Sequence, residues 1–324
     1  MPPEDVLASL NSFFIVISLV MGLLVGSFCN VCVGRWPHGE SVVSPRSRCP
    51  KCMNAIAWFD NIPLLSWIIL GAKCRHCKAP ISWQYPLVEA LTGVLFVCVY
   101  LRFGMTFASP VYMLFAAALV VVTFQDLADW TIPDEISKPG IPIGLALAVV
   151  VSLVGVDSFV VNHPFDSLGG IVLGGGILYL LDRGTVLILK KPGMGMGDVK
   201  LLAMMGAFIG WKGVLGALMA ASFVGSAVGL LVMLYFSMKG ESEVESADAA
   251  KESAAGTVEK DGAAESETEK ADAEGDEEDD FDGITLDHRY LPFGPYLALG
   301  GLLYLFFGPQ VLHWYLASMG LAAG

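Results

Sequence analysis

The chain has 324 residues, 55% of them hydrophobic, and a formal net charge of −13. Its mean hydropathy is +0.63. Soluble domains are about 45–50% apolar, so this composition excludes an ordinary water-soluble protein. The acidity is local, because 18 acidic and 3 basic residues between 241 and 282 give that segment a net charge of −15. The rest of the chain, with a net charge of +2, is not an acidic body.

Apolar runs in chain order predict an all-α polytopic membrane protein with about eight transmembrane helices, because a crossing needs about 20 apolar residues. The first run is interpreted as a retained helix, since no basic residue precedes it as a secretory signal requires. The sixth is short for a full crossing and contains Gly206 and Gly210. The predicted spans are 13–34, 86–103, 108–125, 139–156, 166–189, 199–211, 214–237 and 291–313.

Basic residues set the predicted orientation. The loop 35–85 contains seven Lys and Arg residues, so the positive-inside rule places it in the cytoplasm and the N-terminus outside. Alternation then places 126–138, 190–198 and 238–290 on the inner side as well. The outer loops near 104–107 and 157–165 contain neither Lys nor Arg, which agrees with this orientation.

These features divide the chain into five predicted parts. An acidic insert at 239–288 is poor in large apolar residues and is expected to be disordered, as a linker or a docking site for a basic partner. In the chain, this insert comes directly after the membrane core. The five parts are a first transmembrane helix at 1–34, a cytoplasmic cysteine loop at 35–85, a membrane core at 86–238, the acidic insert at 239–288 and a last transmembrane helix at 289–324.

Four cysteines in the cytoplasmic loop form two C-x2-C pairs, Cys49 with Cys52 and Cys74 with Cys77. This spacing is typical of a zinc ribbon, in which four thiolates complete a tetrahedral site. We therefore predict structural zinc, with a redox or transient site, or no shared site, as the alternatives. Disulfides are disfavoured because the cytoplasm is reducing. The remaining cysteines are interpreted as small hydrophobic residues of the spans: Cys29, Cys32 and Cys98.

Two aspartates at the predicted cytoplasmic membrane edge are candidate catalytic residues. Asp126 follows the third span and Asp198 opens the sixth, and charged residues at such positions are functional candidates. Two adjacent carboxylates tend to share one proton, so one can activate water while the other supports a carbonyl oxygen. Capping of a helix is the alternative for Asp198. Spacing alone does not favour Asp126 over Asp129 or Asp134.

Glycines at 193, 195 and 197 precede Asp198 and would let an extended substrate backbone approach it.

The chain resembles the type IV prepilin peptidase family of GxGD membrane aspartic proteases. The resemblance covers nearly the whole chain and rests on an ordered set of motifs. They are Gly26-Ser27-Phe28-Cys29-Asn30-Val31, the two cysteine pairs with Asp60-Asn61-Ile62-Pro63 and Leu65-Ser66-Trp67 between them, Tyr85-Pro86-Leu87-Val88-Glu89, Asp126-Leu127 with Ile132-Pro133-Asp134, Gly195-Met196-Gly197-Asp198-Val199-Lys200, and Pro292-Phe293-Gly294-Pro295.

The resemblance implies that Asp126 and Asp198 are the catalytic pair. It further implies cleavage of the basic leader of type IV prepilins or type II secretion pseudopilins, after glycine, on the cytoplasmic side of the inner membrane. Many members then N-methylate the new terminus with S-adenosylmethionine, an activity associated with the cytoplasmic loop. Here Leu70-Gly71-Ala72-Lys73-Cys74 stands where the family often has Leu-Arg-Gly-basic-Cys. No residue is assigned to the methyl donor.

Two other functions are weighed against the peptidase. A transporter could use Asp126 and Asp198 for proton coupling, but coupling sites usually lie near the membrane midplane rather than at one edge. A non-catalytic zinc-anchored scaffold of a pilus or secretion assembly would leave the glycine-flanked Asp198 without a role. The expected partners are pilin-type substrates and membrane lipid, with no nucleic acid.

Overall fold

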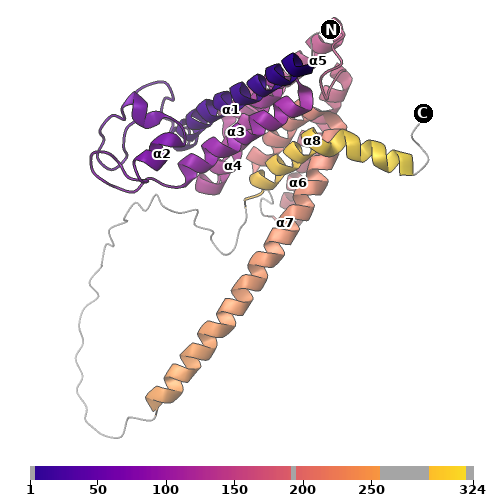
Figure 1. Cartoon of the computed structure of the whole chain (residues 1–324). Coiled ribbons are helices and arrows are strands. Elements are labelled where there is room, and N and C mark those ends of the chain that lie inside the picture. Colours follow the sequence, from indigo (N-terminus) through magenta and orange to yellow (C-terminus); the bar gives the residue numbers. More distant parts are fainter. Residues whose placement is uncertain (1–3, 191–194, 256–291, 319–324) are drawn as a thin grey trace. The chain divides into compact units, whose positions relative to one another are not determined.

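The computed structural model describes residues 4–190, 195–255 and 292–318 (Figure 1), and these are helical apart from loops and isolated bridges. Within these described residues, six helices are long and apolar enough to cross a membrane. The elements are α1 (Glu4–Arg35), η1 (Trp58–Asn61), α2 (Leu65–Ile69), α3 (Gln84–Phe103), α4 (Ala108–Asp129), α5 (Asp134–Val154), α6 (Pro164–Leu189), α7 (Met196–Ala255) and α8 (Gly294–Ser318).

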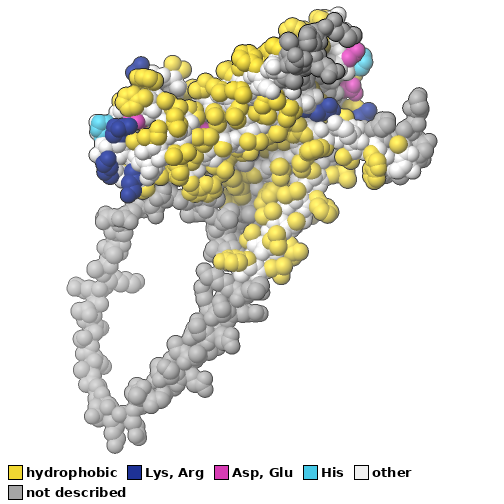
Figure 2. Space-filling view, in the orientation of Figure 1, with side chains coloured by type: hydrophobic (Ala, Val, Ile, Leu, Met, Phe, Trp, Pro, Cys, Tyr) yellow, Lys and Arg dark blue, Asp and Glu magenta, His cyan; other side chains and the backbone are white. Residues whose placement is uncertain are grey.

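Helices follow from the need to satisfy every backbone polar group inside a bilayer, where water is absent. Their outward faces are covered by hydrophobic side chains, whereas Lys and Arg gather at the end that contains the cysteine loop (Figure 2). The all-helical membrane fold and the cysteine loop between the first two spans are therefore confirmed.

Helix α7 consists of two arms that meet at Gly210, whose backbone is non-helical with φ 71° and ψ 178°. A side chain at Gly300 would meet Ala217 of the second arm, and one at Gly301 would meet Met205 of the first. Because both arms reach adjacent residues of α8, the chain reverses at Gly210. The arms correspond to the predicted spans 199–211 and 214–237, and α8 corresponds to the last one.

The helix α7 continues to Ala255 and includes the start of the predicted acidic insert. Residues 239–255 are helical, which differs from the expected disorder; the rest of the insert, from 256, lies outside the described residues. The physical reason is that this stretch is rich in Ala and Glu, which favour helix even without a core to join. The first of two units in the chain includes α7 as far as Phe223, and the described residues 224–255 of α7 belong to the second.

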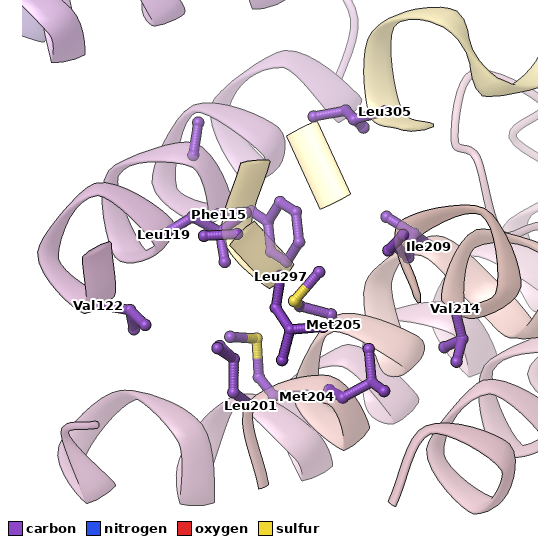
Figure 3. Close-up of a cluster of buried hydrophobic side chains, with 14 of the residues drawn as sticks. Phe115, Leu119, Val122, Leu201, Met204, Met205, Ile209, Val214, Leu297 and Leu305 are labelled. Carbon is purple, nitrogen blue, oxygen red and sulfur yellow. The ribbon is translucent and has the colours of Figure 1, made fainter. Parts of the chain in front are cut away.

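The main core lies between α4, the two arms of α7 and α8 (Figure 3). Phe115 and Leu119 of α4 face Met205 of α7 and Leu297 of α8 in this cluster. A second cluster joins α1 and α3 to the other face of α4. Helix α4 is thus the shared centre of both clusters, and its last turn contains Asp126.

Glycine allows the closest helix contact in the core. A side chain at Gly170 of α6 would collide with the backbone of Gly206 in α7, and the reverse holds for Gly206. Because neither position has room for a Cβ atom, the two backbones pack directly against each other, as small residues permit in membranes.

We expect Gly170→Ala to push α6 and α7 apart and lower the free energy of unfolding by about 1–3 kcal/mol, the usual effect of overpacking. Gly176→Ala is the matched control, because a Cβ there meets no atom within 4 Å. Thermal unfolding in detergent should show a lower midpoint for Gly170→Ala and an unchanged or higher one for Gly176→Ala. Equal midpoints would contradict the close approach.

Candidate active site and metal centre

Asp126 lies in the last turn of α4 with only 6% of its surface exposed. A carboxylate at a helix C-terminus is disfavoured by the helix dipole, so another group must hold it there. The backbone N–H of Gly294, at the start of α8, donates a hydrogen bond of 3.0 Å to Asp126 Oδ2. The predicted residue is therefore fixed by a partner 168 positions away, which no local pattern indicates.

Asp198 is the third residue of α7 and is 9% exposed. It lies inside the first turn rather than at the cap position, so the capping alternative does not describe it. Its carboxylate interacts electrostatically with Asp126. Its Oδ1 atom is buried and has no hydrogen-bond partner among the described residues. A buried acceptor without a partner is destabilising by about 1–3 kcal/mol.

Ile132 packs the three segments of this site together. A Cβ atom at Gly197 would come within 3.0 Å of the Ile132 side chain, and one at Gly294 would meet both Ile132 and Asp126. Both glycines are thus required by close packing around the carboxylates. Gly195 differs, because the nearest atom to a Cβ there is Asp198 Oδ2 at 3.7 Å. Gly193 lies outside the described residues.

The structure separates the other two acidic candidates from this pair. Asp129 is exposed at the end of α4. Asp134 forms ion pairs with Lys138 and with Lys200, both at 2.7 Å. Asp134 therefore ties the start of α5 to the start of α7, which holds Asp198, and its carboxylate is already occupied.

The four loop cysteines come together as their spacing predicts. Their Sγ atoms all lie within 4.8 Å of one another, and Cys49 Sγ is 3.8 Å from Cys77 Sγ. A tetrahedral site with metal–sulfur bonds of about 2.3 Å has sulfur–sulfur edges of about 3.8 Å, so the cluster fits a metal ion with four sulfur ligands. All seven cysteines are free thiols.

Two turns of the same design present these thiols. In the first, the N–H of Met53 donates to Cys49 O and the N–H of Cys49 donates to Asn54 O. In the second, Lys78 donates to Cys74 O and Cys74 donates to Ala79 O. Each turn needs a positive φ after its second cysteine, and Met53 and Lys78 have φ of 58° and 60°.

A bidentate ion pair braces the second turn. The Nε and Nη2 atoms of Arg75 donate to the two carboxylate oxygens of Asp60 at 2.7 and 2.6 Å, and the guanidinium lies over the Phe59 ring. Arg75 also holds the pKa of Asp60 below its usual range. The backbone N–H groups of Cys77 and His76 hydrogen-bond to Cys74 and lower its pKa to about 6, which favours a metal-binding thiolate.

A buried glutamate attaches the loop to the membrane helices. Glu89 of α3 accepts a hydrogen bond of 2.8 Å from the N–H of Leu64, and Asn30 of α1 donates one of 3.0 Å to Tyr85 O. Local sequence does not predict these contacts, although Glu89 and Asn30 both lie in motifs shared with the prepilin peptidase family. Gly294 was missed in the same way, since its role depends on a backbone N–H.

Comparison with known protein families places two models on this chain. Residues 20–103 match the bacterial peptidase A24 N-terminal domain, and this range contains the second half of α1, the cysteine loop and α3. Residues 113–230 match the type IV leader peptidase family, and this range contains both Asp126 and Asp198. No solved structure matches the chain.

Several curated relatives are named prepilin leader peptidase/N-methyltransferase. The protein from Pseudomonas aeruginosa is 30% identical over 99% of both chains, and that from Stutzerimonas stutzeri is 31% identical over 98% of both. The protein from Myxococcus xanthus is 42% identical over 68% of this chain and 64% of its own length. The polytopic chain with its buried carboxylate pair thus belongs to the type IV leader peptidase family.

We expect the purified chain to hold one metal ion and Cys74→Ser to lose most of it, because three thiolates leave the tetrahedral site incomplete. Cys98→Ser is the matched control, since Cys98 lies in α3 outside the cluster. Elemental analysis of each variant measures the content and identifies the metal. Equal metal content in Cys74→Ser and in the parent would contradict the site.

Proposed function

We propose that this chain is an inner-membrane aspartic endopeptidase and N-methyltransferase acting on type IV prepilins or type II secretion pseudopilins. It cleaves the basic leader after glycine on the cytoplasmic side and then methylates the new N-terminus. The family and the names of its relatives support both activities. The observation that carries the peptidase is the pair of buried, interacting carboxylates of Asp126 and Asp198.

The peptidase chemistry assigns one role to each aspartate. Two buried carboxylates that interact in this way share one proton, because both cannot easily ionise. The ionised group takes a proton from water, which attacks the scissile carbonyl carbon, and the protonated group supports the carbonyl oxygen. The proton then passes to the leaving amine. The Gly294 N–H holds Asp126 through Oδ2, whereas Asp198 Oδ1 is left available to water or substrate.

Glycine positions give the substrate access to the pair. The absence of a side chain at Gly195 leaves space beside Asp198 Oδ2. An extended backbone can approach the carboxylates along this side. The space beside Gly197 and Gly294 is instead occupied by the Ile132 side chain. This arrangement favours a peptide substrate over a free ion, and thus the peptidase over a transporter.

The cysteine cluster is proposed to hold structural zinc, because an all-thiolate tetrahedral set suits zinc and leaves no open position for catalysis. Arg75, Asp60 and Glu89 fix the loop around it. S-adenosylmethionine supplies the methyl group for the second reaction when bound. Gly71 and Ala72, at the departure from the family motif, both have positive φ, of 61° and 58°.

The orientation is proposed from the distribution of basic residues. The cysteine loop and both aspartates face the cytoplasm, and the N-terminus faces the periplasm. The α4 end that contains Asp126 and the α7 end that contains Asp198 then lie at one membrane edge, where a basic leader would remain in the cytoplasm. The Gly210 turn, which contacts Asp166 and Val161, lies toward the other edge.

We expect Asp126→Asn and Asp198→Asn each to lower leader cleavage by about 10²–10⁴-fold or more, since each removes an acid–base group. Asp129→Asn, at an exposed residue of the same helix end, should retain it. The assay offers a synthetic prepilin with S-adenosylmethionine and determines the product's intact mass. Normal cleavage by both pair variants would overturn the assignment, and the mass separately shows whether a methyl group has replaced a hydrogen.

We expect Gly294→Ala to reduce cleavage by about 10²-fold, because a methyl group there collides with Asp126 and shifts it from its productive position. Gly176→Ala is again the matched control. The same mass assay gives the rate, and the thermal midpoint shows whether the bundle is intact. An active Gly294→Ala variant would show that the Asp126 contact does not govern catalysis.

A further inference from the structure

The short helix α2 (Leu65–Ile69) turns its polar groups toward the loop. The Ser66 hydroxyl donates to Ile62 O at 2.7 Å, and Ser66 is buried. The Trp67 indole N–H donates to Ile81 O at 3.3 Å. These two contacts fix the rotation of the helix about its axis, and therefore determine which side chains face outward.

The opposite side of α2 is apolar and exposed. Leu65, Ile68 and Ile69 are 50, 67 and 69% exposed, and their i, i+3, i+4 spacing places them on one face, which we call the α2 face. Three large aliphatic side chains on so short a helix are not explained by packing within the chain. A contiguous exposed apolar patch marks a surface that meets a membrane or another protein.

A hydrogen bond sets the depth of this surface. The residue before α2, Leu64, donates its N–H to Glu89 Oε2. Glu89 lies five residues after Gln84, the first residue of α3, which is about 7–8 Å along the helix axis. Because α3 is one of the membrane-crossing helices, α2 begins beside the first turns of a span and not out in the cytoplasm. Figure 1 shows α2 within the loop that joins α1 to α3.

The charge of the loop indicates the occupant. Residues 35–85 contain seven Lys and Arg residues against Glu40 and Asp60, and Asp60 is paired with Arg75. Basic residues beside an apolar helical face favour a bilayer surface with anionic lipids. The same positive charge disfavours a basic leader as the occupant.

We propose that the α2 face docks into the interfacial region of the lipid bilayer and holds the cysteine loop flat against the membrane. The apolar side chains enter the boundary between headgroups and acyl chains, and the net positive charge of the loop favours anionic headgroups. The cysteine cluster is thereby kept at the membrane edge that contains Asp126 and Asp198. This inference does not depend on the proposed catalytic activity.

The test places a fluorescent reporter on the α2 face. The full-length variant Ile69→Trp is reconstituted in nanodiscs of zwitterionic and anionic lipids, with and without bromine on the acyl chains. Its matched control is Arg46→Trp, at an exposed charged position of the same loop. The emission of the parent is subtracted from each. Retained metal content shows that the loop of each variant is folded.

We expect brominated lipid to quench more than about half of the emission added by Ile69→Trp, since an interfacial helix buries its apolar face about 5–10 Å deep. Iodide in the buffer should quench the emission of Ile69→Trp only a little. For Arg46→Trp we expect the opposite, with strong quenching by iodide and little by brominated lipid. Quenching of Ile69→Trp by iodide but not by brominated lipid would overturn the proposal. Protection from both quenchers would equally overturn it, because a second copy or another protein would then cover the face.

Discussion

The absence of water inside a bilayer is the constraint on which the rest of this structure depends. Every backbone group must find a partner within the chain, which forces the apolar segments into helices. The same constraint makes each polar atom without a partner informative. Among the described residues, Asp198 Oδ1 is such an atom, and the Asp198 carboxylate interacts with the buried carboxylate of Asp126. Burying two carboxylates in one site lowers the free energy of unfolding, and helix packing in the rest of the bundle must offset this loss.

Close packing between helix backbones is one such stabilising feature of the bundle. The contact between Gly170 and Gly206 lets α6 and α7 approach closely, and the turn at Gly210 lets both arms of α7 reach α8. Helix α8 then presents the Gly294 N–H to Asp126. The position of one catalytic candidate thus depends on glycines distributed over three helices, none of which is recognisable as part of the site from local sequence.

Sequence reasoning found what depends on composition and local spacing. Apolar runs predicted the spans, and the two C-x2-C pairs predicted a cluster that the structure contains. It could not choose Asp126 over Asp134, because the ion pairs of Asp134 with Lys138 and Lys200 arise only in the fold. Nor could it find the contact of Leu64 with Glu89, which joins residues 25 apart. The helix at 239–255 was missed because the absence of a core was taken to exclude secondary structure.

The cysteine loop and the carboxylate pair are coupled through one packed cluster. Cys29, Cys32 and Val33 at the end of α1 pack with Phe124 of α4, two residues before Asp126. The loop leaves the membrane from this end of α1 and returns through α3, where Glu89 holds Leu64. A displacement of the loop would therefore be transmitted to the helix that contains Asp126. The proposed cleavage and methylation act in succession on one peptide terminus, and this packed connection would keep the loop in place between the two steps.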